Sequence, residues 1–524
     1  MLPNISLLIM DFRKKVLWLI LVSSLVRCCI ALFLEFGNDE VYYWTYAQHL
    51  AWNYFDHPPL IALLIRLTTF NLHFQSEFFV RLGPILCAAV NTWLMFLIGC
   101  KIKDERAGWY AALLYVSSFY CSVIAGTFIL PDSPQLFWWI WSIYLMTSII
   151  DNPTAEKKTN LLLLGIAIGL STMSKVHGIF LWFGFGVYLL FFRRDLLKSA
   201  YLYVAILVTL IIISPIFFWN FQNHFITYTY HGNRVGFFGK HLDIDSFLQQ
   251  VFGSIFYNNA VNIVLYIVAL MAITRKRIDV PSRYIRLYLL LALPLIIVLL
   301  IMSLFNETLP HWSGPAYISI MLLTAFYFSK KNKDSKKIPT GISIALGLSF
   351  GIIILAVPLI KFLPMQIGSK EERRLGKGDV SLDMTGWEEF AHQFDSLYRT
   401  DKSSGTMKGN AMIISDFWYP AAHLDYYIAR PSHMNIMAIG KLTDIHHYAW
   451  LNKERPMLQN GEDAYFIFPS NYYGPPREEL KNCFEHVDDS IIVKQYRSNF
   501  PVRNFVVYRM HGYKRGIGID GLME

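Results

Sequence analysis

The stretch LYLLLALPLIIVLLIMSLF (Leu287–Phe305) contains no charged residue and approaches the roughly 20 residues that a helix needs to cross a bilayer. The whole chain of 524 residues is 54% apolar and only 16% charged. Soluble globular proteins have about 25% charged residues, so this composition excludes an ordinary soluble protein. We therefore predict a polytopic α-helical membrane protein with about eleven spans, in the apolar runs 16–34, 78–100, 107–125, 134–150, 160–174, 177–192, 200–218, 255–274, 286–305, 313–329 and 339–360.

The basic residues that give the chain its net charge of +9 lie mostly between apolar runs. This favours membrane topology over nucleic-acid binding as the cause of the charge. With the N-terminus in the cytoplasm, the inner loops hold 21 Lys and Arg residues and the outer loops before residue 361 hold 5. The positive-inside rule therefore predicts a cytoplasmic N-terminus without a cleaved signal peptide. The five outer residues are Arg66, Arg81, Lys175, Arg234 and Lys240.

The chain changes character after residue 360. Residues 361–524 are more polar and contain short strand-like runs at Ala411–Ser415, Ala464–Phe468 and Phe505–Tyr508. We predict a small α/β domain there, on the outer side of the membrane because the number of spans is odd. Residues 1–360 form the predicted transmembrane domain. Its first outer loop, at about 35–77, is rich in aromatic residues and predicts helices lying at the membrane surface.

Candidate chemistry lies in outward-facing segments. The first outer loop contains Asn38-Asp39-Glu40, and the other outer segments contribute Asp132, Lys175 and His311. Ionisable groups at membrane depth are costly and are therefore functional candidates. The two acids could instead cap a surface helix, since a carboxylate is favoured in a first helical turn.

These segments resemble the dolichyl-phosphate-mannose protein mannosyltransferase superfamily, and most closely its bacterial branch of lipid A aminoarabinose transferases and lipopolysaccharide sugar transferases. The resemblance covers roughly residues 16–330, with a fainter likeness at Ser415–Leu424. It implies a C-type glycosyltransferase fold and a polyprenyl-phosphate sugar donor. The motifs are Asp39-Glu40-x-Tyr42-Tyr43-Trp44, Tyr54-Phe55-Asp56-His57-Pro58-Pro59-Leu60, Leu130-Pro131-Asp132-Ser133-Pro134, Ser174-Lys175-Val176-His177-Gly178 and Pro310-His311-Trp312-Ser313-Gly314-Pro315-Ala316-Tyr317.

The resemblance also implies a catalytic aspartate in the first outer loop, and Asp39 matches it, with Glu40 beside it. A carboxylate within reach of an acceptor hydroxyl can take its proton, and positive groups are needed near the departing lipid phosphate. The outer candidates for that contact are His57, Arg81 and Lys175. In the aminoarabinose enzymes a lysine stands at the place of His57, which leaves its role open.

Each binding candidate has a simpler interpretation. Lys175 could extend its ammonium group to the interface, and Arg81 could pair with Glu77 across one helical turn. Asp132 could cap a helix, and His311 could anchor the chain at the membrane surface. For the adjacent His446-His447 we expect a surface location, because no other ligand accompanies them at metal-binding spacing.

The sequence therefore predicts an inner-membrane hexosyl- or pentosyltransferase. It would move a sugar from a polyprenyl-phosphate carrier to lipid A, core oligosaccharide or another glycan at the periplasmic face. A divalent metal held by Asp39, Glu40 and His57 is conceivable, but no ligand spacing requires one. The main alternative is a transporter or flippase of a lipid-linked sugar, which would bury its charges within the spans. A lipid-linked sugar polymerase would lack the Asp39-Glu40 motif as it is placed here.

Overall fold

The computed structural model describes residues 11–151, 156–236, 241–335 and 337–514. These residues form two compact units. The helical unit comprises Met1–Ala31 and His57–Ile353, and the sheet unit comprises Leu32–Asp56 and Ile354–Glu524. Lys240, Lys336 and both chain ends, which enter the topology prediction, lie outside the described residues.

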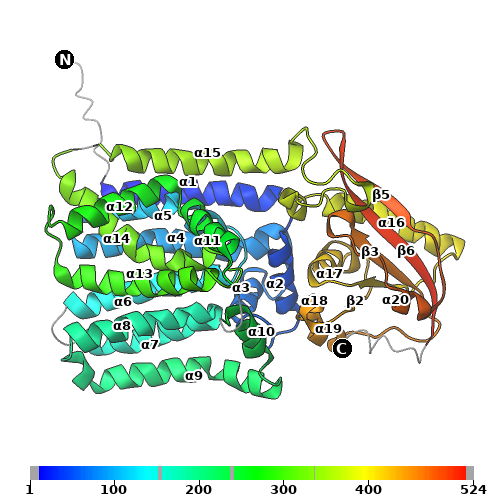
Figure 1. Ribbon diagram of the computed structural model, residues 1–524, viewed down its shortest axis with the longest axis horizontal. Coiled ribbons are helices and arrows are strands. Elements are labelled where there is room, and N and C mark those ends of the chain that lie inside the picture. Colours follow the sequence, from blue (N-terminus) through cyan, green and yellow to red (C-terminus); the bar gives the residue numbers. More distant parts are fainter. Residues whose placement is uncertain (1–10, 152–155, 237–240, 336, 515–524) are drawn as a thin grey trace, which may run out of the picture. The chain divides into compact units, whose positions relative to one another are not determined.

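The predicted apolar runs all fall on helices, and the long helices of the helical unit lie side by side (Figure 1). The protein is a multi-pass membrane protein with an α-helical bundle and a small sheet domain, as the sequence predicts. The helices before residue 363, apart from α2, are α1 (Phe12–Phe33), α3 (Leu60–Thr68), α4 (Glu77–Ile102), α5 (Glu105–Ser117), α6 (Asp132–Asp151), α7 (Glu156–Ser174), α8 (Phe180–Phe192), α9 (Ala200–Gln222), α10 (Ile226–Val235), α11 (Ile244–Tyr257), α12 (Ala260–Thr274), α13 (Ser282–Ser303), α14 (Gly314–Lys331) and α15 (Thr340–Phe362).

Five of the described helices are long and apolar enough to cross a membrane, or six if one bent pair counts as a single span. The other runs form shorter or less apolar helices, and the count of eleven spans stays a prediction. The bent pair is α11 and α12, which meet at 91° within the run 255–274. Asn259 causes the break, because its φ of 67° is non-helical and its side chain caps Val261 N at 3.1 Å.

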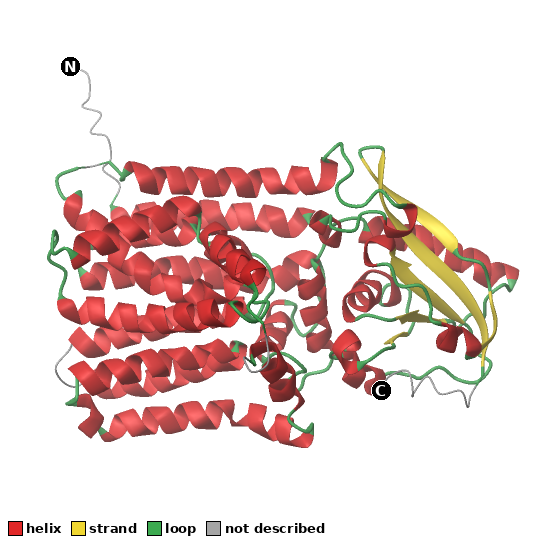
Figure 2. Ribbon diagram, viewed as in Figure 1, coloured by secondary structure: helices red, strands yellow, loops and turns green. Residues whose placement is uncertain are grey.

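The sheet unit contains a six-stranded mixed sheet with helices beside it (Figure 2). The predicted strands at 411–415, 464–468 and 505–508 are confirmed as parts of β1, β3 and β6. The strand order is β2-β1-β3-β6-β4, with β5 also paired to β6; β1 is parallel to β2 and β3, and the other pairs are antiparallel. The bounds are β1 (Met412–Ser415), β2 (Ile436–Ala438), β3 (Ala464–Pro469), β4 (Phe484–Val487), β5 (Ile491–Arg497), β6 (Phe500–Tyr513), α2 (Asn38–Gln48), α16 (Trp387–Ser404), α17 (Trp418–Leu424), α18 (Leu442–Ile445), α19 (Tyr448–Glu454) and α20 (Glu478–Asn482).

The segment Leu32–Asp56 folds with the C-terminal residues, whereas the sequence prediction placed it in the transmembrane domain. The aromatic side chains of α2 are buried in the sheet unit. Tyr42 lies 4.7 Å from Trp418 and Trp44 lies 5.1 Å from Tyr426, between ring centroids. These aromatic residues therefore stabilise the sheet unit, and their enrichment in this loop is explained by packing.

Glu35 fastens the start of this segment to α16. Its two carboxylate oxygens accept hydrogen bonds from Gly386 N at 3.0 Å and Trp387 N at 2.7 Å. Burial raises the pKa of the Glu35 carboxyl from 4.5 to about 7, against the opposing effect of these hydrogen bonds and of Arg503. The folded protein therefore binds a proton at Glu35 more tightly than the unfolded chain does.

This shift predicts a pH-dependent stability. The contribution of Glu35 is fully present below a pH of about 4.5 and is lost as the pH rises through about 7. We expect Glu35→Gln to flatten the fall in melting temperature between these pH values, measured on the purified full chain. The exposed Glu389→Gln is the matched control and should leave the slope unchanged. Equal slopes in all three proteins would contradict the assignment.

Candidate functional site

A buried ion pair occupies the ends of helices α6 and α7 in the helical unit. Lys175, between α7 and the 3-10 turn Val176–Ile179, places its Nζ 2.8 Å from Oδ2 of Asp132, the first residue of α6. The side chains of Lys175 and Asp132 are only 4% and 3% exposed. The ammonium group of Lys175 is therefore buried in an ion pair, whereas Asp132, in the first turn of α6, can still act as a helix cap.

Tyr120 is the third member of this arrangement. Its hydroxyl donates a hydrogen bond of 3.0 Å to the other carboxylate oxygen, Oδ1 of Asp132. Tyr120 is available because α5 ends at Ser117 and Ser118 is extended, so the predicted run 107–125 is not one helix. The Asp132 carboxylate is thus held by a cation on one oxygen and by a phenol on the other, which fixes its position.

His311 belongs to the same arrangement. It lies in the turn Pro310–Ser313 just before α14 and interacts electrostatically with Asp132 and Lys175. The neighbouring Trp312 has the Lys175 ammonium 5.9 Å from its ring centroid. We call Tyr120, Asp132, Lys175 and His311 the Asp132 cluster. Three of the seven residues singled out from the sequence therefore meet here, together with Tyr120, which sequence reasoning missed.

Histidines lie near this cluster. His177 interacts electrostatically with Lys175, Asp132 and His57. The ring of His57 lies 6.3 Å from that of His231. The predicted binding residue His57 is therefore linked to the Asp132 cluster through His177, which interacts electrostatically with both.

Arg81 is completely buried in α4, and its guanidinium group lies 5.7 Å from the ring centroid of Phe128. Phe128 O accepts a hydrogen bond from the Ser133 hydroxyl at 2.9 Å, so Arg81 packs against the loop that leads into Asp132.

Glycine is required at the start of α14. A Cβ on Gly314 would lie 2.4 Å from ring atoms of Tyr120, so the absence of a side chain lets this ring approach. The Pro310–Gly314 motif therefore contributes to the Asp132 cluster in two ways. It supplies His311, and its Gly314 leaves space for the ring of Tyr120.

We expect Gly314→Ala to displace Tyr120 and to lower the free energy of unfolding by about 1–3 kcal/mol, as overpacking commonly does. Gly347→Ala in α15 is the control, because a Cβ there meets nothing within 4 Å. The control should be neutral or slightly stabilising. Thermal unfolding of both variants in detergent measures the difference, and equal melting temperatures would refute the packing argument.

Asp39 and Glu40 occupy the first turn of α2 in the sheet unit. Glu40 is 2% exposed, and its Oε2 accepts a hydrogen bond from Gly37 N at 3.1 Å. It therefore closes the N-terminal turn in the manner of a capping residue. Asp39 is exposed instead. Its carboxylate is accessible and sits at the positive end of the helix.

Long-range hydrogen bonds hold this turn in place. The Asn38 amide oxygen lies 2.9 Å from Nε2 of His423, and its Nδ2 donates to the Tyr472 hydroxyl at 3.1 Å. Tyr42 donates to Asp56 at 3.2 Å and accepts from His447 N at 3.2 Å. The turn that carries Asp39 is therefore positioned by residues from the C-terminal part of the sequence.

The expectation that His446 and His447 lie at the surface is wrong. They are only 9% and 3% exposed, because their rings pack among aromatic residues. His447 lies 4.8 Å from Tyr54, and His446 is stacked 5.3 Å from Trp418. Burial lowers the pKa of His447 to about 3, so its ring is neutral at physiological pH.

Among the residues that the structure describes, no group of three or more His, Cys, Asp and Glu side chains could hold a metal ion. Each unit by itself contributes one candidate group: the sheet unit has the exposed carboxylate of Asp39 on α2, and the helical unit has the buried ammonium of Lys175.

Comparisons with known proteins bear on the fold and on the family resemblance. The family model of dolichyl-phosphate-mannose-protein mannosyltransferases matches residues 56–219. The lipid A galacturonosyltransferase RgtD of Rhizobium johnstonii is 23% identical over 361 residues, which are 67% of this chain and 72% of that protein. Apo ArnT from Cupriavidus metallidurans has a TM-score of 0.61 at 13% identity, over 95% of this chain and 98% of that one.

A second structure of ArnT, bound to undecaprenyl phosphate, also has a TM-score of 0.61, at 14% identity, and covers 94% of this chain and 98% of that one. These similarities show an ArnT-like fold over nearly the whole chain. The family-model match and the similarity to RgtD confirm the resemblance to the dolichyl-phosphate-mannose protein mannosyltransferase superfamily, and the two ArnT structures show the fold.

Proposed function

We propose that this protein is a membrane glycosyltransferase that moves one sugar from a polyprenyl-phosphate carrier to an envelope acceptor. The observation that carries the proposal is the fold, which is shared along nearly the whole chain with a protein known in complex with undecaprenyl phosphate. The lipid A galacturonosyltransferase relative favours a glycolipid acceptor, either lipid A itself or the attached core oligosaccharide.

Asp39 is the proposed general base. An acceptor hydroxyl is a weak nucleophile, and a carboxylate that takes its proton as the new glycosidic bond forms lowers the barrier. The exposure of Asp39 in the first turn of α2 suits this role. Glu40 has a supporting role, because its carboxylate is already engaged at Gly37 N.

Lys175 is the proposed contact for the departing lipid phosphate. A lysine ammonium has three N–H donors, and the bond to Asp132 uses one of them. The others can reach an anion, while Asp132 holds the ammonium in one position. Positive charge fixed in advance stabilises the negative charge that develops on the leaving group. His57, Arg81 and His311 are further candidates for binding the donor.

The direct test compares envelope glycolipids by mass spectrometry in cells with and without the gene. Loss of one hexosyl, hexuronosyl or pentosyl mass from a glycolipid would support the proposal and identify the sugar. An unchanged glycolipid profile would contradict it. Reconstitution with a polyprenyl-phosphate sugar and lipid A then separates transfer from the alternative, because a flippase would move the donor across the membrane without forming a glycosidic bond.

The proposed topology places the N-terminus in the cytoplasm and the C-terminal domain in the periplasm. It rests on the excess of basic residues in alternate loops of the sequence. A reporter fused at Lys333 should show a cytoplasmic location, and a reporter fused at Glu524 should show a periplasmic location. Signals of the same side from both fusions would overturn the proposed topology.

A further inference from the structure

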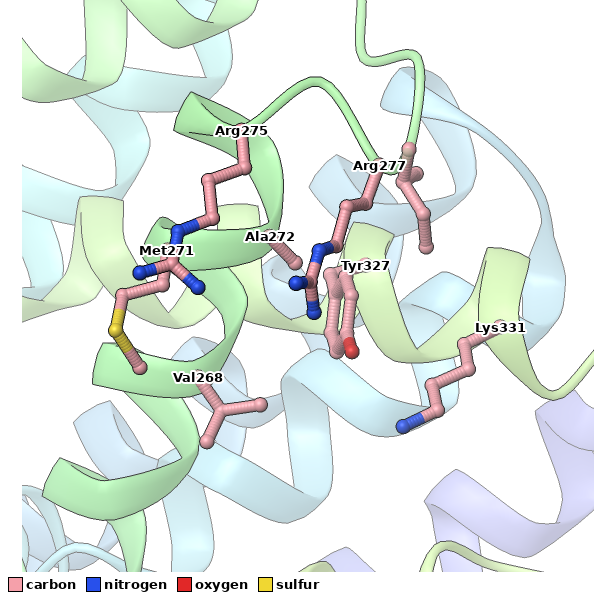
Figure 3. A pocket seen from close by; sticks show the side chains of 8 residues that line it. Val268, Met271, Ala272, Arg275, Arg277, Tyr327 and Lys331 are labelled. Carbon is pink, nitrogen blue, oxygen red and sulfur yellow. The ribbon is translucent and has the colours of Figure 1, made fainter.

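A cationic cavity lies between the ends of α12 and α14 in the helical unit. Its volume is about 360 Å³. Figure 3 shows that its basic side chains come from two segments: Arg275 and Arg277 lie in the loop that follows α12, and Lys331 ends α14. The rest of the lining is Val268, Met271, Ala272, Ile278 and Tyr327.

The cavity is separate from the Asp132 cluster. His311 of that cluster precedes the N-terminus of α14, whereas Tyr327 and Lys331 belong to the last turns of the same helix. An α-helix rises 1.5 Å per residue, so the 18 residues of α14 separate the two sites by roughly the thickness of the hydrocarbon core. The cavity therefore has no part in the proposed transfer chemistry.

The walls of the cavity are held by backbone contacts. Arg277 N donates to Ala272 O at 2.9 Å, which folds the loop back on the end of α12. Lys330 Nζ donates to Asp279 O at 2.7 Å, which ties the same loop to α14. The Lys331 ammonium lies 5.7 Å from the Tyr327 ring centroid. The basic groups thus surround a formed cavity.

The charge of the cavity is not neutralised within the described part of the chain. There, Arg275, Arg277 and Lys331 form no ion pair with a carboxylate. Three cations around one cavity attract a ligand with a phosphate group, because arginine binds phosphate oxygens through paired N–H donors.

An apolar stripe on α12 continues from the cavity. Val264, Ile267 and Met271 are 58%, 51% and 44% exposed, and their spacing places them on one face of the helix. Met271 also lines the cavity. A ligand with a phosphate and an attached hydrocarbon chain would match both features, whereas a free phosphate would use only the first.

We propose that this cavity binds the headgroup of an anionic phospholipid, with an acyl chain along the exposed face of α12. Basic pockets between membrane helices bind such headgroups, and the predicted topology places this one at the cytoplasmic face. The bound lipid would fix the loop between α12 and α13.

The test uses the delipidated full chain in a neutral detergent, with phosphatidylglycerol, phosphatidylethanolamine and inorganic phosphate as probes. Binding is followed by native mass spectrometry and by the shift in melting temperature. We expect phosphatidylglycerol to bind on the order of tenfold more tightly than phosphatidylethanolamine. Neutralising the cavity by the combined changes Arg275→Gln, Arg277→Gln and Lys331→Gln should abolish this preference.

The matched control removes three other exposed charges from the same end of the unit, by Lys276→Gln, Lys333→Gln and Lys337→Gln. It should keep the preference. Arg277→Gln alone should weaken it partly, which keeps the test valid if the triple variant is unstable. An unchanged preference in the cavity variants would overturn the proposal. Equal stabilisation by inorganic phosphate would also overturn it, because the acyl chain would then contribute nothing.

Discussion

Asp39→Asn is expected to lower the rate of sugar transfer by about 10²–10⁴-fold while leaving the protein folded. The change preserves the size of the side chain and much of its hydrogen bonding, but an amide cannot accept the proton of the acceptor hydroxyl. Asp39 is exposed, so its replacement removes no buried side chain. The measurement is transfer from a polyprenyl-phosphate sugar by purified variants of equal thermal stability.

Glu40→Gln is the matched control, because it changes the adjacent residue in the same way. The Glu40 side chain accepts a hydrogen bond from Gly37 N, and a glutamine oxygen can still accept it. We expect a much smaller loss of rate. If Glu40→Gln is inactive and Asp39→Asn is active, the two roles are reversed. If both variants are active, the two acids only stabilise the start of α2.

Removing one partner of the Lys175–Asp132 pair is expected to destabilise the protein by about 3–5 kcal/mol, because it leaves a buried charge without compensation. Lys175→Met and Asp132→Asn should each lower the melting temperature strongly. The double variant should lose much less than the sum of the two, since no buried charge remains. Lys198→Met, which replaces an exposed lysine, is the control and should have the melting temperature of the unmodified protein.

The same double-mutant cycle separates a structural role of Lys175 from a role in donor binding. If Lys175 contacts the lipid phosphate, the double variant regains stability but still fails to use the donor, with a raised donor KM. Full activity of the stable double variant would show that the ion pair only supports the fold. Additive losses of stability would show that the two residues do not act as a pair.

Hydropathy predicted the helices of this protein well, because long apolar stretches are a local property of the sequence. It did not predict their interruptions. The break at Ser118 and the bend at Asn259 depend on backbone conformations at single polar residues, which a windowed average does not detect. The strands β1 and β3 were predictable for the same local reason, since both are short, buried and apolar.

The candidate site was only partly predictable. The sequence marked Asp132 and Lys175 separately, but their pairing across 43 positions follows from the packing of α6 and α7. The role of Tyr120 could not be predicted from the sequence, because tyrosines are common in apolar runs. Buried His446 and His447 were misjudged because their partners are aromatic rings, and the prediction had considered only metal ligands and the surface.

The incorporation of α2 into the sheet unit bears on how relatives of this protein can be recombined. Phe36 N donates to the Tyr427 hydroxyl at 2.8 Å, 391 positions away, and Asn38 contacts His423 across 385 positions. A chimera with a single crossover near residue 354 would pair α2 of one parent with the sheet of another. Exchange that preserves these contacts needs additional crossovers on both sides of residues 32–56, so the interchangeable part is discontinuous in the gene.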